Sequence, residues 1–303
     1  MEHQSIDLSI CIASYGNNVG ALIEALLDEI KANPTLSNTE IQISDQFPEA
    51  QPLHENWTQH PRVHYHHYTE QQGRAANRNH LVAMSQGAQL LFLDADALPV
   101  LPNFIAQYLK HAAPHTVLVG GTAYHSDHKQ WLRYKVGIQK ESISANRRSQ
   151  APYSNFSAFN VCMDRAVAET IAFDANVLVY GHEDTLFGLE LRHRCLPVKH
   201  LENPAYHLGI DSDKVFMEKT KTAVLGLAAL INAGKIDEDV RLYATYKKLQ
   251  SWGGAVLLRW LHPVFNQWMF GRLSAGRGTV AMFDLYKLVV LCAAQPKVGR
   301  KIS

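Results

Sequence analysis

The chain has 303 residues, of which 47% are hydrophobic and 19% are charged, so it is long enough to bury a full core and to carry an appendage. This composition excludes a disordered protein. Its 29 basic and 28 acidic residues give a formal net charge of +1, so no global positive field indicates nucleic acid as a partner.

The cysteines indicate a reducing compartment. They stand far apart and form no CxxC pair, and three of the four lie among apolar residues, at Cys11, Cys162, Cys195 and Cys292. We therefore expect reduced thiols in a cytoplasmic protein. The N-terminal residues lack the pattern of a signal peptide, and no apolar run reaches the length needed to cross a bilayer.

The first predicted elements are a strand and a helix. In "IDLSICIASYGNN", apolar residues alternate with polar or small ones at Ile6, Leu8, Ile10 and Ile12, which predicts a strand covered mainly on one side. Apolar residues at helical spacing between 19 and 30 predict a helix that Asn17 or Asn18 caps and that ends before Pro34.

The following elements repeat this alternation. We expect strands at 40–46, 62–68 and 88–96, with a helix that begins at Gly73 before the last of them. The β-α-β order predicts an α/β fold with parallel strands and right-handed crossovers. Ligands of such sheets bind at the carboxyl ends of the strands, and Asp45, Asp94 and Asp96 all stand there.

The segment "LLFLDADALP" (90–99) ends a buried strand in two carboxylates. Asp94 and Asp96 are oxygen ligands of the kind that Mg²⁺ and Mn²⁺ prefer, and such ions complete their shell with phosphate oxygens and water. A nucleotide diphosphate supplies those phosphates. The alternative is that the two residues only begin a turn before Pro99.

Several segments together resemble family 2 glycosyltransferases of the GT-A fold. They are "SICIASYGNN", "ISDQ", "GRAANRNHLVAMSQGAQLLFLDADALP" and "YGHEDTLFGLELRHR", in the order and approximate spacing of that family over roughly residues 5–210. The resemblance implies a GT-A fold and an inverting transfer of a sugar from a nucleotide diphosphate sugar, with Mn²⁺ or Mg²⁺ on the diphosphate.

The resemblance also implies roles for donor-side residues. Ala13, Ser14 and Tyr15 would border the base, Asp45 would contact the base or ribose, Arg78 would lie near the diphosphate, Asp94 would bind ribose or sugar, and Asp96 would bind the metal. One departure weakens the choice of nucleotide: the family's second strand usually ends in two acidic residues followed by Gly-Ser, whereas this one reads "SDQF".

Phosphate binding has a second candidate in the helix that begins at Gly73. The chain lacks GxGxxG after its first strand and lacks GxxxxGK[ST], so the dinucleotide and P-loop interpretations have no phosphate cradle. The first turn of the Gly73 helix can offer backbone N–H groups, with Arg74 and Arg78 at i, i+4 spacing. The alternative for these two arginines is a solvated basic face.

Glu183 and Asp184 open a predicted helix after Gly181. Carboxylates in a first helical turn are stabilised by the macrodipole, so capping alone can explain both. The resemblance implies instead that Asp184 is the general base that takes the proton of the acceptor hydroxyl and that Glu183 holds acceptor hydroxyls.

Other residues complete the predicted site. The resemblance implies that His207 is a further metal ligand, although a lone histidine is usually a satisfied core or surface residue. Asn155 or Asn160 would line the sugar pocket, with turn formation as the alternative for Asn155. The polar stretch 125–153 shows no clear period, and its Trp131 would stack on a sugar or anchor the loop.

Helical patterns dominate beyond about residue 212. We expect a catalytic domain at 1–211, with a donor half at about 1–100 and an acceptor half at about 115–211, and a helical extension at 212–303. Within residues 251–303, seven basic residues accompany a single acidic one, Asp284, which gives this part a charge of 7 − 1 = +6.

This extension contains a basic, aromatic stripe. Its apolar residues in "AVLLRWLHPVFNQWMFGR" are Leu257, Leu261, Val264, Phe265 and Trp268. Such a helix can lie in a membrane interface, or it can pack on the catalytic domain or on a second subunit in a homodimer. Pro263 disfavours one continuous helix in each case.

The resemblance therefore implies a metal-dependent, inverting glycosyltransferase of surface polysaccharide synthesis, and the likeness of its "YGHED" segment implies the sugar. The donor would be a UDP-sugar carrying galactose or N-acetylgalactosamine, and the acceptor a glycan or lipid-linked hydroxyl at the inner face of the plasma membrane. A sugar-phosphate nucleotidyltransferase is one alternative, but it needs a glycine-rich basic loop that "ASYGNNVG" does not supply. A non-catalytic carbohydrate-binding relative is the other.

Overall fold

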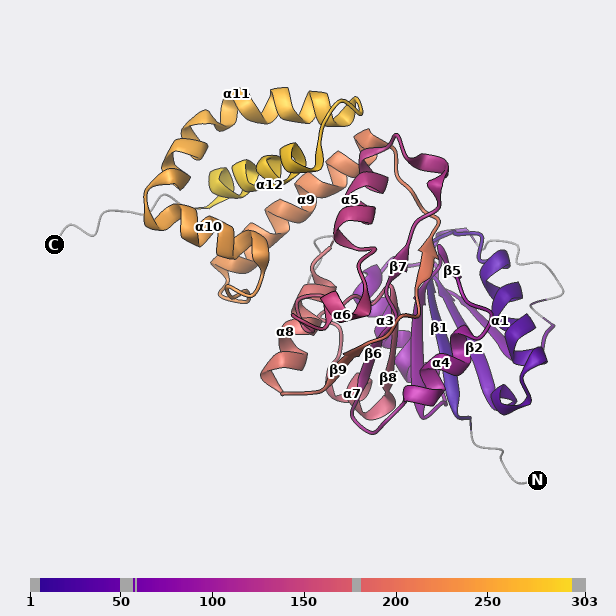
Figure 1. Cartoon of the computed structure of the whole chain (residues 1–303). Helices are drawn as coiled ribbons and strands as arrows, with labels where there is room; N and C mark the ends of the chain where they lie inside the picture. The colour runs from indigo at the N-terminus through magenta and orange to yellow at the C-terminus, as the bar shows by residue number, and fades with distance from the viewer. Residues whose placement is uncertain (1–5, 50–56, 58, 176–180, 296–303) are drawn as a thin grey trace. The chain divides into compact units, whose positions relative to one another are not determined.

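The computed structural model describes residues 6–49, 57, 59–175 and 181–295, and Figure 1 shows its elements. The chain divides into two compact units. The first contains residues 1–127, 137–178 and 183–209, and the second contains 128–136, 179–182 and 210–303. The second unit thus combines the C-terminal residues with two short segments from the middle of the chain.

A mostly parallel sheet forms the centre of the first unit. Its described strands are β1 (Leu8–Ser14), β2 (Thr39–Asp45), β3 (Val63–His67), β4 (Gln89–Asp94), β6 (Val117–Val119), β8 (Asn160–Asp164) and β9 (Val198–His200). Their order is β3-β2-β1-β4-β8-β6-β9, and β8 runs antiparallel to both of its neighbours. The predicted parallel β-α-β arrangement is confirmed for β1 to β4.

The reversed strand β8 brings the two halves of the first unit together. Asn160 pairs with Leu93, and the Asp94 N–H donates to the Phe159 carbonyl at 3.1 Å. Because β8 is antiparallel, its first residues lie beside the last residues of β4. The segment that enters β8 therefore meets the sheet at the edge where β4 ends.

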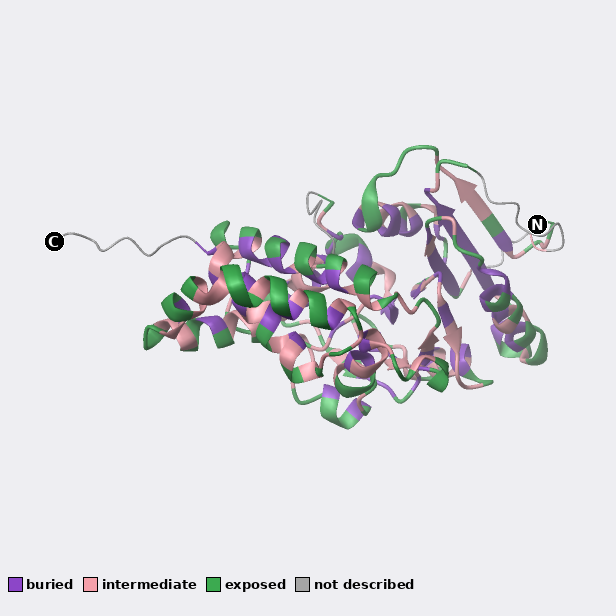
Figure 2. Ribbon diagram, turned by 90° about the horizontal axis from the view of Figure 1, so that it is seen from above, coloured by how far each residue is buried: buried purple, intermediate pink, exposed green. Residues whose placement is uncertain are grey.

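The sheet is covered on both faces. Helices α1 (Gly20–Ala32) and α4 (Phe104–His111) pack with one apolar cluster, and α3 (Gly73–Met84), α7 (Arg165–Thr170) and α8 (Glu183–His193) pack with another. Most strand residues are accordingly buried (Figure 2). The expectation that the first strand is covered mainly on one side is wrong, because Ser9 and Cys11 are as buried as Ile10.

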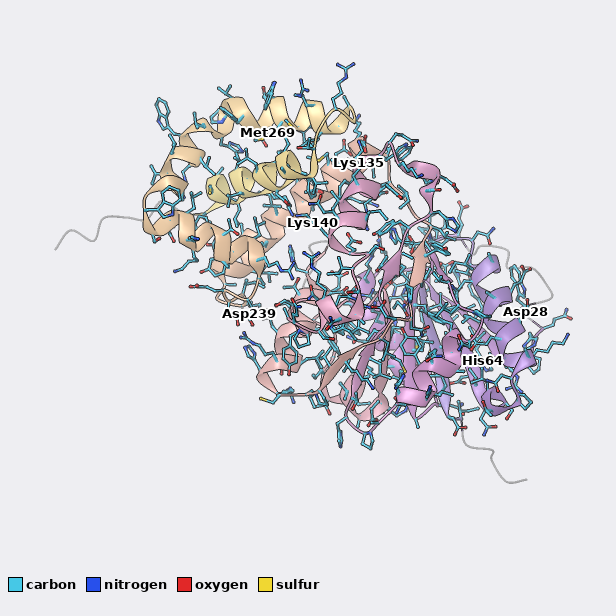
Figure 3. The ribbon with its side chains drawn as sticks, viewed as in Figure 1. Asp28, His64, Lys135, Lys140, Asp239 and Met269 are labelled. Carbon is cyan, nitrogen blue, oxygen red and sulfur yellow. The ribbon has the colours of Figure 1, made fainter. Side chains whose placement is uncertain are left out.

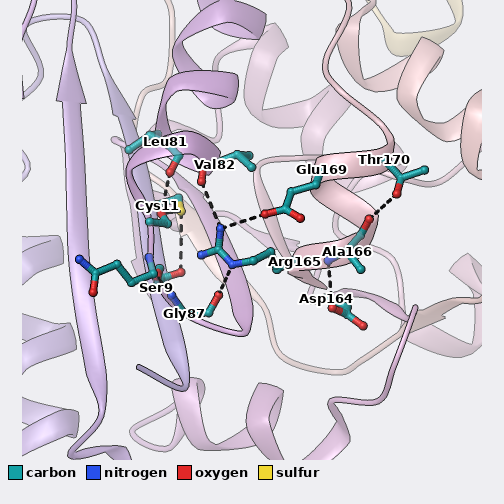
Figure 4. A network of polar contacts seen from close by, with 12 residues as sticks. Ser9, Cys11, Leu81, Val82, Gly87, Asp164, Arg165, Ala166, Glu169 and Thr170 are labelled. Atoms are coloured by element: carbon teal, nitrogen blue, oxygen red, sulfur yellow. Dashed lines mark hydrogen bonds and ion pairs between the residues drawn. The ribbon is translucent and has the colours of Figure 1, made fainter. Parts of the chain in front are cut away.

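Polar side chains join elements that are far apart in sequence, and the partly buried Arg165 is one of them. Arg165, at the start of α7, donates from Nε to the Gly87 carbonyl at 2.8 Å and from Nη1 to the Val82 carbonyl at 3.4 Å (Figure 4). Its Nη1 also lies 3.4 Å from the Glu169 carboxylate. Arg165 thereby fixes the end of α3 and the turn before β4 against α7.

Glu29 of α1 stabilises the start of α4. Its two carboxylate oxygens accept the N–H groups of Ile105 and Ala106 at 2.9 and 3.0 Å. These N–H groups belong to the first turn of α4 and have no partner within that helix. A carboxylate at this place also complements the positive end of the helix dipole.

A small second sheet lies in the same unit. Its strands are β5 (Ala97–Pro99), β10 (Ala205–His207) and β7 (Thr122–Ala123), in the order β5-β10-β7. His207 pairs with Ala97, so the residues that follow β4 lie beside β10. This pairing brings two positions together that are more than a hundred residues apart in the sequence.

The stretch 125–153 has more regular structure than its sequence predicts. It contains a 3₁₀ turn at Ser126–His128, α5 (Leu132–Lys140) and α6 (Ala145–Arg148). Arg148 is buried and donates to the carbonyls of Ile143, Val119, Gly120 and Leu201. One buried cation thus ties this stretch to β6 and to the end of β9.

The second unit is helical, as predicted beyond residue 212. Its long helices are α9 (Asp213–Asn232), α10 (Arg241–Ser251), α11 (Gly254–Ser274) and α12 (Val280–Ala294), and α11 packs against α12 and α9. Helix α11 continues through Pro263, contrary to the expectation of a break. Within the described residues, no helix is both long enough and apolar enough to span a membrane.

Candidate functional site

Three neighbouring strands end in polar residues at one edge of the large sheet. Ser14 pairs with Asp45 at the ends of β1 and β2, and Ala13 pairs with Asp94 at the ends of β1 and β4. Parallel strands expose their carboxyl ends together, so these side chains share one edge. Asn77 of α3 supports the edge by donating to the Ser44 carbonyl at 3.1 Å.

Arg78 of α3 joins the strand edge to the beginning of α8. Its guanidinium lies 2.8 Å from Asp94 Oδ1, 3.4 Å from Asp184 Oδ1 and 3.9 Å from Glu183 Oε1. Burial lowers the pKa of Arg78, but the three carboxylates outweigh it and raise the pKa overall. Arg78 is therefore a fixed positive charge among acidic groups that the sequence places up to 106 residues away.

Asp184 is held by the segment that enters β8. Its Oδ2 accepts the N–H of Ala158 at 2.9 Å and the hydroxyl of Ser157 at 3.3 Å. Burial raises the pKa of Asp184, while Arg78 lowers it and Glu183 raises it, with a net upward shift. A carboxylate with a raised pKa and fixed orientation is suited to accept a proton near neutral pH.

Asp96 and His207 meet between β5 and β10. His207 Nε2 lies 3.3 Å from Asp96 Oδ2, and the imidazole packs between the rings of Tyr124 and Phe159, with centroid distances of 5.7 and 5.3 Å. Burial raises the pKa of Asp96, which His207 lowers and Asp94 raises. The structure thus brings both predicted metal ligands together.

The side chains of Asp96 and His207 are suitable ligands for a divalent cation. One carboxylate and one imidazole suit Mn²⁺, and the resulting shell leaves room for phosphate oxygens and water. The described residues contain no group of three or more His, Cys, Asp or Glu side chains arranged to hold a metal by themselves. A metal held by Asp96 and His207 would complete its shell with further ligands, such as phosphate oxygens and water.

Gly209 gives Asp96 its space. A Cβ atom built at Gly209 would overlap the Asp96 carboxylate. The Leu208 N–H also donates to the Asp96 carbonyl at 2.9 Å, so the chain after β10 follows the Asp96 backbone closely. Glycine at residue 209 therefore lets the carboxylate keep its position beside His207.

Asp45 contacts the loop that follows the predicted base-binding residues Ala13, Ser14 and Tyr15. Its Oδ1 accepts the N–H groups of Gly16 and Phe47 at 2.9 and 3.1 Å, and its Oδ2 accepts the Tyr65 hydroxyl at 3.2 Å. With 1% of its surface exposed, Asp45 uses its oxygens to shape two loops. Tyr15 is 46% exposed beside them and meets the Phe47 ring edge-on at 5.2 Å.

The predicted acceptor residues have different environments. Asn160 is buried, accepts the Tyr108 hydroxyl at 2.5 Å, and donates to the carbonyls of Gly121 and Asn203 at 3.0 and 2.9 Å. Asn155 donates to the Arg148 carbonyl at 2.9 Å. Trp131 belongs to the second unit, where its ring lies 5.4 Å from the ring of His128.

Two contributors to the site were not predicted. Ser157 holds Asp184, and Phe173 lies under the guanidinium of Arg78 at 5.3 Å from its ring centroid. Ser157 stands just before a strand in "SNFSAFNVC", which is a weak signal for a side chain at a sheet edge. Phe173 had no such signal, since an apolar residue in a loop does not reveal which cation it contacts.

The sequence profile of glycosyl transferase family 2 matches residues 9–171, which is more than half of the chain. The chain belongs to this family. It is therefore a glycosyltransferase, and the resemblance and enzyme class predicted from the sequence are confirmed. No curated protein matches the sequence.

Solved structures show that this glycosyltransferase has the GT-A fold. The mannosyltransferase PcManGT from Pyrobaculum calidifontis, in complex with GDP-Man and Mn²⁺, matches with a TM-score of 0.57 and 13% identity over 96% of this chain and 87% of that one. S. aureus TarS 1–349 in complex with UDP matches with a TM-score of 0.50 and 14% identity, over 94% and 90% of the two chains. The predicted fold class is confirmed.

Proposed function

We propose that this family 2 glycosyltransferase moves a sugar, with inversion, from a nucleotide diphosphate sugar to a hydroxyl of a glycan or lipid-linked acceptor. The observation that carries the proposal is the ion-pair network in which Arg78 joins Asp94 to Asp184. Asp94, the proposed donor ligand, and Asp184, the proposed base, share this one cation, which supports the proposal. Such an arrangement is suited to a displacement in which the acceptor oxygen attacks C1 of the sugar as the nucleotide diphosphate leaves.

Asp184 would be the general base. Its Oδ2 is fixed by Ala158 and Ser157, and Oδ1 faces Arg78. In the proposed step, Asp184 takes the proton of the acceptor hydroxyl while that oxygen bonds to C1 of the sugar. The bond from C1 to the diphosphate oxygen breaks on the opposite side, and the electron pair leaves with the nucleotide diphosphate.

Arg78 would act through the acidic residues that it contacts. It is only 3% exposed, so its proposed role is to fix Asp94 and Asp184 and to provide positive charge near the departing diphosphate. Glu183, 3.9 Å from the same guanidinium, would hold acceptor hydroxyls. Asp94 would contact the ribose or sugar of the donor.

Asp96 and His207 would hold Mn²⁺ or Mg²⁺. When bound, the cation would neutralise charge on the leaving diphosphate. Mn²⁺ in the complex of the mannosyltransferase supports divalent metal use by this fold, although that structure shares only 13% identity with this chain. Family membership also favours glycosyl transfer over the nucleotidyltransferase alternative.

The nucleotide and sugar are the finer part of the proposal. The two neighbours carry GDP-Man and UDP, so the fold accepts both nucleotides. We propose a UDP-sugar with galactose or N-acetylgalactosamine, on the resemblance of the "YGHED" segment. Ala13, Ser14 and Tyr15 would border the base, and Asp45 would shape their loops. Asn155, Asn160 and Trp131 stay predictions for the acceptor side.

A donor panel tests this function. Thermal unfolding is measured with Mn²⁺ and each nucleotide sugar, for the wild type and for Asp96→Ala, because a ligand of the native state raises the melting temperature. We expect one donor to stabilise the wild type and to lose its effect in Asp96→Ala. Asp184→Asn should bind that donor but lower kcat by on the order of 10²–10⁴-fold. Unchanged turnover in Asp184→Asn would contradict the assignment of the base.

A further inference from the structure

Helix α11 has two apolar faces. Ala255, Met269 and Leu273 are buried where α11 packs in the second unit, and Met269 is labelled in Figure 3. The opposite side carries Val256, Leu257, Trp260, Val264 and Trp268, with exposures from 55% for Trp268 to 83% for Trp260. We call these five residues the α11 outer face.

The α11 outer face is one continuous surface. At about 100° of rotation per residue, its members fall within a sector of about 120°. Trp252, just before the helix, adds a further indole that is 70% exposed. A helix that is apolar on both sides is normally buried on both, so this exposed side is suited to meet an apolar phase.

The charged residues of the sequence on both sides of this face are of one sign. Residues 240–283 contain no Asp or Glu, and their basic residues are Arg241, Lys247, Lys248, Arg259, Arg272 and Arg277. The Arg272 guanidinium lies 5.7 Å from the centroid of the Trp268 ring, so positive charge directly borders the α11 outer face. Arg259 is committed to the carbonyls of Cys292 and Gln295.

These features favour an anionic lipid surface over other occupants. Tryptophan is enriched at the boundary between acyl chains and headgroups, and lysine and arginine near it are attracted by anionic lipids. A second copy of the chain would bring like charges together, which opposes pairing of two outer faces. Although α11 has 21 residues, it is not apolar enough to span a bilayer, so it would lie in the plane of the interface.

We propose that the α11 outer face, with Trp252, docks this enzyme on the surface of a bilayer that contains anionic phospholipid. The lipid contact itself does not depend on catalysis. Its use, to hold the enzyme beside a lipid-linked acceptor, rests on the function proposed above.

Vesicle flotation tests the proposal without donor or acceptor. The full-length protein is mixed with vesicles of phosphatidylcholine alone or with added phosphatidylglycerol, and tryptophan emission is recorded in parallel. We expect binding and a blue shift with the anionic vesicles, weakening as salt is raised because salt screens the basic residues. Binding to neither vesicle by the wild type would overturn the proposal.

Matched variants locate the contact. Trp260→Glu should weaken binding by about tenfold or more, because it places a charge at the centre of the apolar face. Leu225→Glu, at a 46% exposed position of α9, should bind as the wild type does. The double variant Arg272→Glu/Arg277→Glu should weaken binding to anionic vesicles and reduce its salt dependence. Equal binding by a correctly folded Trp260→Glu protein would overturn the proposal.

Two further measurements distinguish lipid docking from self-association and from failure of the proposed function. Light scattering of the wild type and Trp260→Glu reports association of copies, and a dimer that Trp260→Glu dissolves would assign the face to self-association and overturn lipid docking. Transfer to a water-soluble acceptor should be unchanged in Trp260→Glu. If transfer is absent in the wild type while vesicle binding persists, the proposed function fails and the lipid contact stands.

Discussion

At the scale of residues, Arg78 holds three acidic side chains at one place. It is buried among Asp94, Glu183 and Asp184, whose mutual repulsion it offsets. Removing a buried cation from such a set leaves carboxylates without their partner, which costs far more than breaking a surface ion pair. Its proposed contribution to catalysis is therefore inseparable from its effect on the charge of Asp184.

The pH dependence of turnover should report Asp184. The base must be ionised, and burial raises its pKa above the ordinary value for Asp of about 3.9, so kcat should fall as pH drops through that raised pKa. Arg78 lowers the same pKa. In Arg78→Met, the acidic limb should therefore move to higher pH, measured as kcat at saturating donor. An unmoved limb would show that another group titrates.

Gly209 should control metal affinity through Asp96. In Gly209→Ala the new methyl group overlaps the Asp96 carboxylate, which must turn away from His207. We expect Mn²⁺ to stabilise this variant less than the wild type in thermal unfolding. Gly271→Ala is the matched control, because nothing lies within 4 Å of its added Cβ. Equal Mn²⁺ stabilisation of Gly209→Ala would remove Asp96 from the metal site.

At the scale of elements, the Glu29 side chain links α1 to the first turn of α4. Glu29→Ala leaves the N–H groups of Ile105 and Ala106 without their acceptor, so we expect a loss of about 1–3 kcal/mol in the free energy of unfolding. Urea denaturation measures it. Glu24→Ala, at an exposed position of the same helix, should change stability by less than about 0.5 kcal/mol. Similar losses in both variants would show that α4 does not need this cap.

The elements differ in how far the sequence predicts them. Strands β1 to β4 and helices α1, α3 and α8 follow from hydrophobic period and turn residues, which are local signals. The direction of β8 depends on pairing with β4, so no local pattern contains it. The polar segment around α6 shows no clear period in the sequence. Its order depends on Arg148, which looks like a surface residue but is buried and donates to the carbonyls of Val119 in β6 and Leu201 after β9.

In the candidate site, too, local sequence patterns predict some features, whereas others depend on distant contacts. Asp94, Asp96 and Asp184 stand in motifs with recognisable spacing, and the structure brings Asp94 and Asp184 to one cation. The burial of Asp45 and Asn160 could not be predicted, because it depends on Tyr65 and Tyr108 reaching them from other elements. Polar residues at strand ends predict a site edge but not which of them face the ligand.

At the scale of the whole molecule, the two units interleave in sequence. Asp213 accepts the Leu132 N–H at 2.6 Å, and the Arg133 guanidinium lies over the Phe216 ring at 5.5 Å. The segment 128–136 thus belongs with α9 although it precedes it by some eighty residues. The boundary predicted at residues 211–212 remains a prediction for how function divides along the chain.

Truncation should reveal this interleaving. A chain ending at residue 211 loses the partners of Leu132 and Arg133, so we expect lower soluble yield and a lower melting temperature than for the full chain. A chain ending at residue 295 retains α9 to α12 and serves as the second truncation for comparison. If the 1–211 protein is as soluble and as stable as the full chain, segment 128–136 does not need α9.

The reversal of β8 has a consequence for how new specificities arise. The loop that leads into β8 carries Ser157 and Ala158, which orient Asp184, whereas the edge proposed to bind the donor is formed by β1, β2 and β4. Substitutions confined to the loop that leads into β8 would therefore change the surroundings of Asp184 while β1, β2 and β4 keep their register. Under the proposed roles, acceptor preference and donor preference would then be set by different segments of one chain.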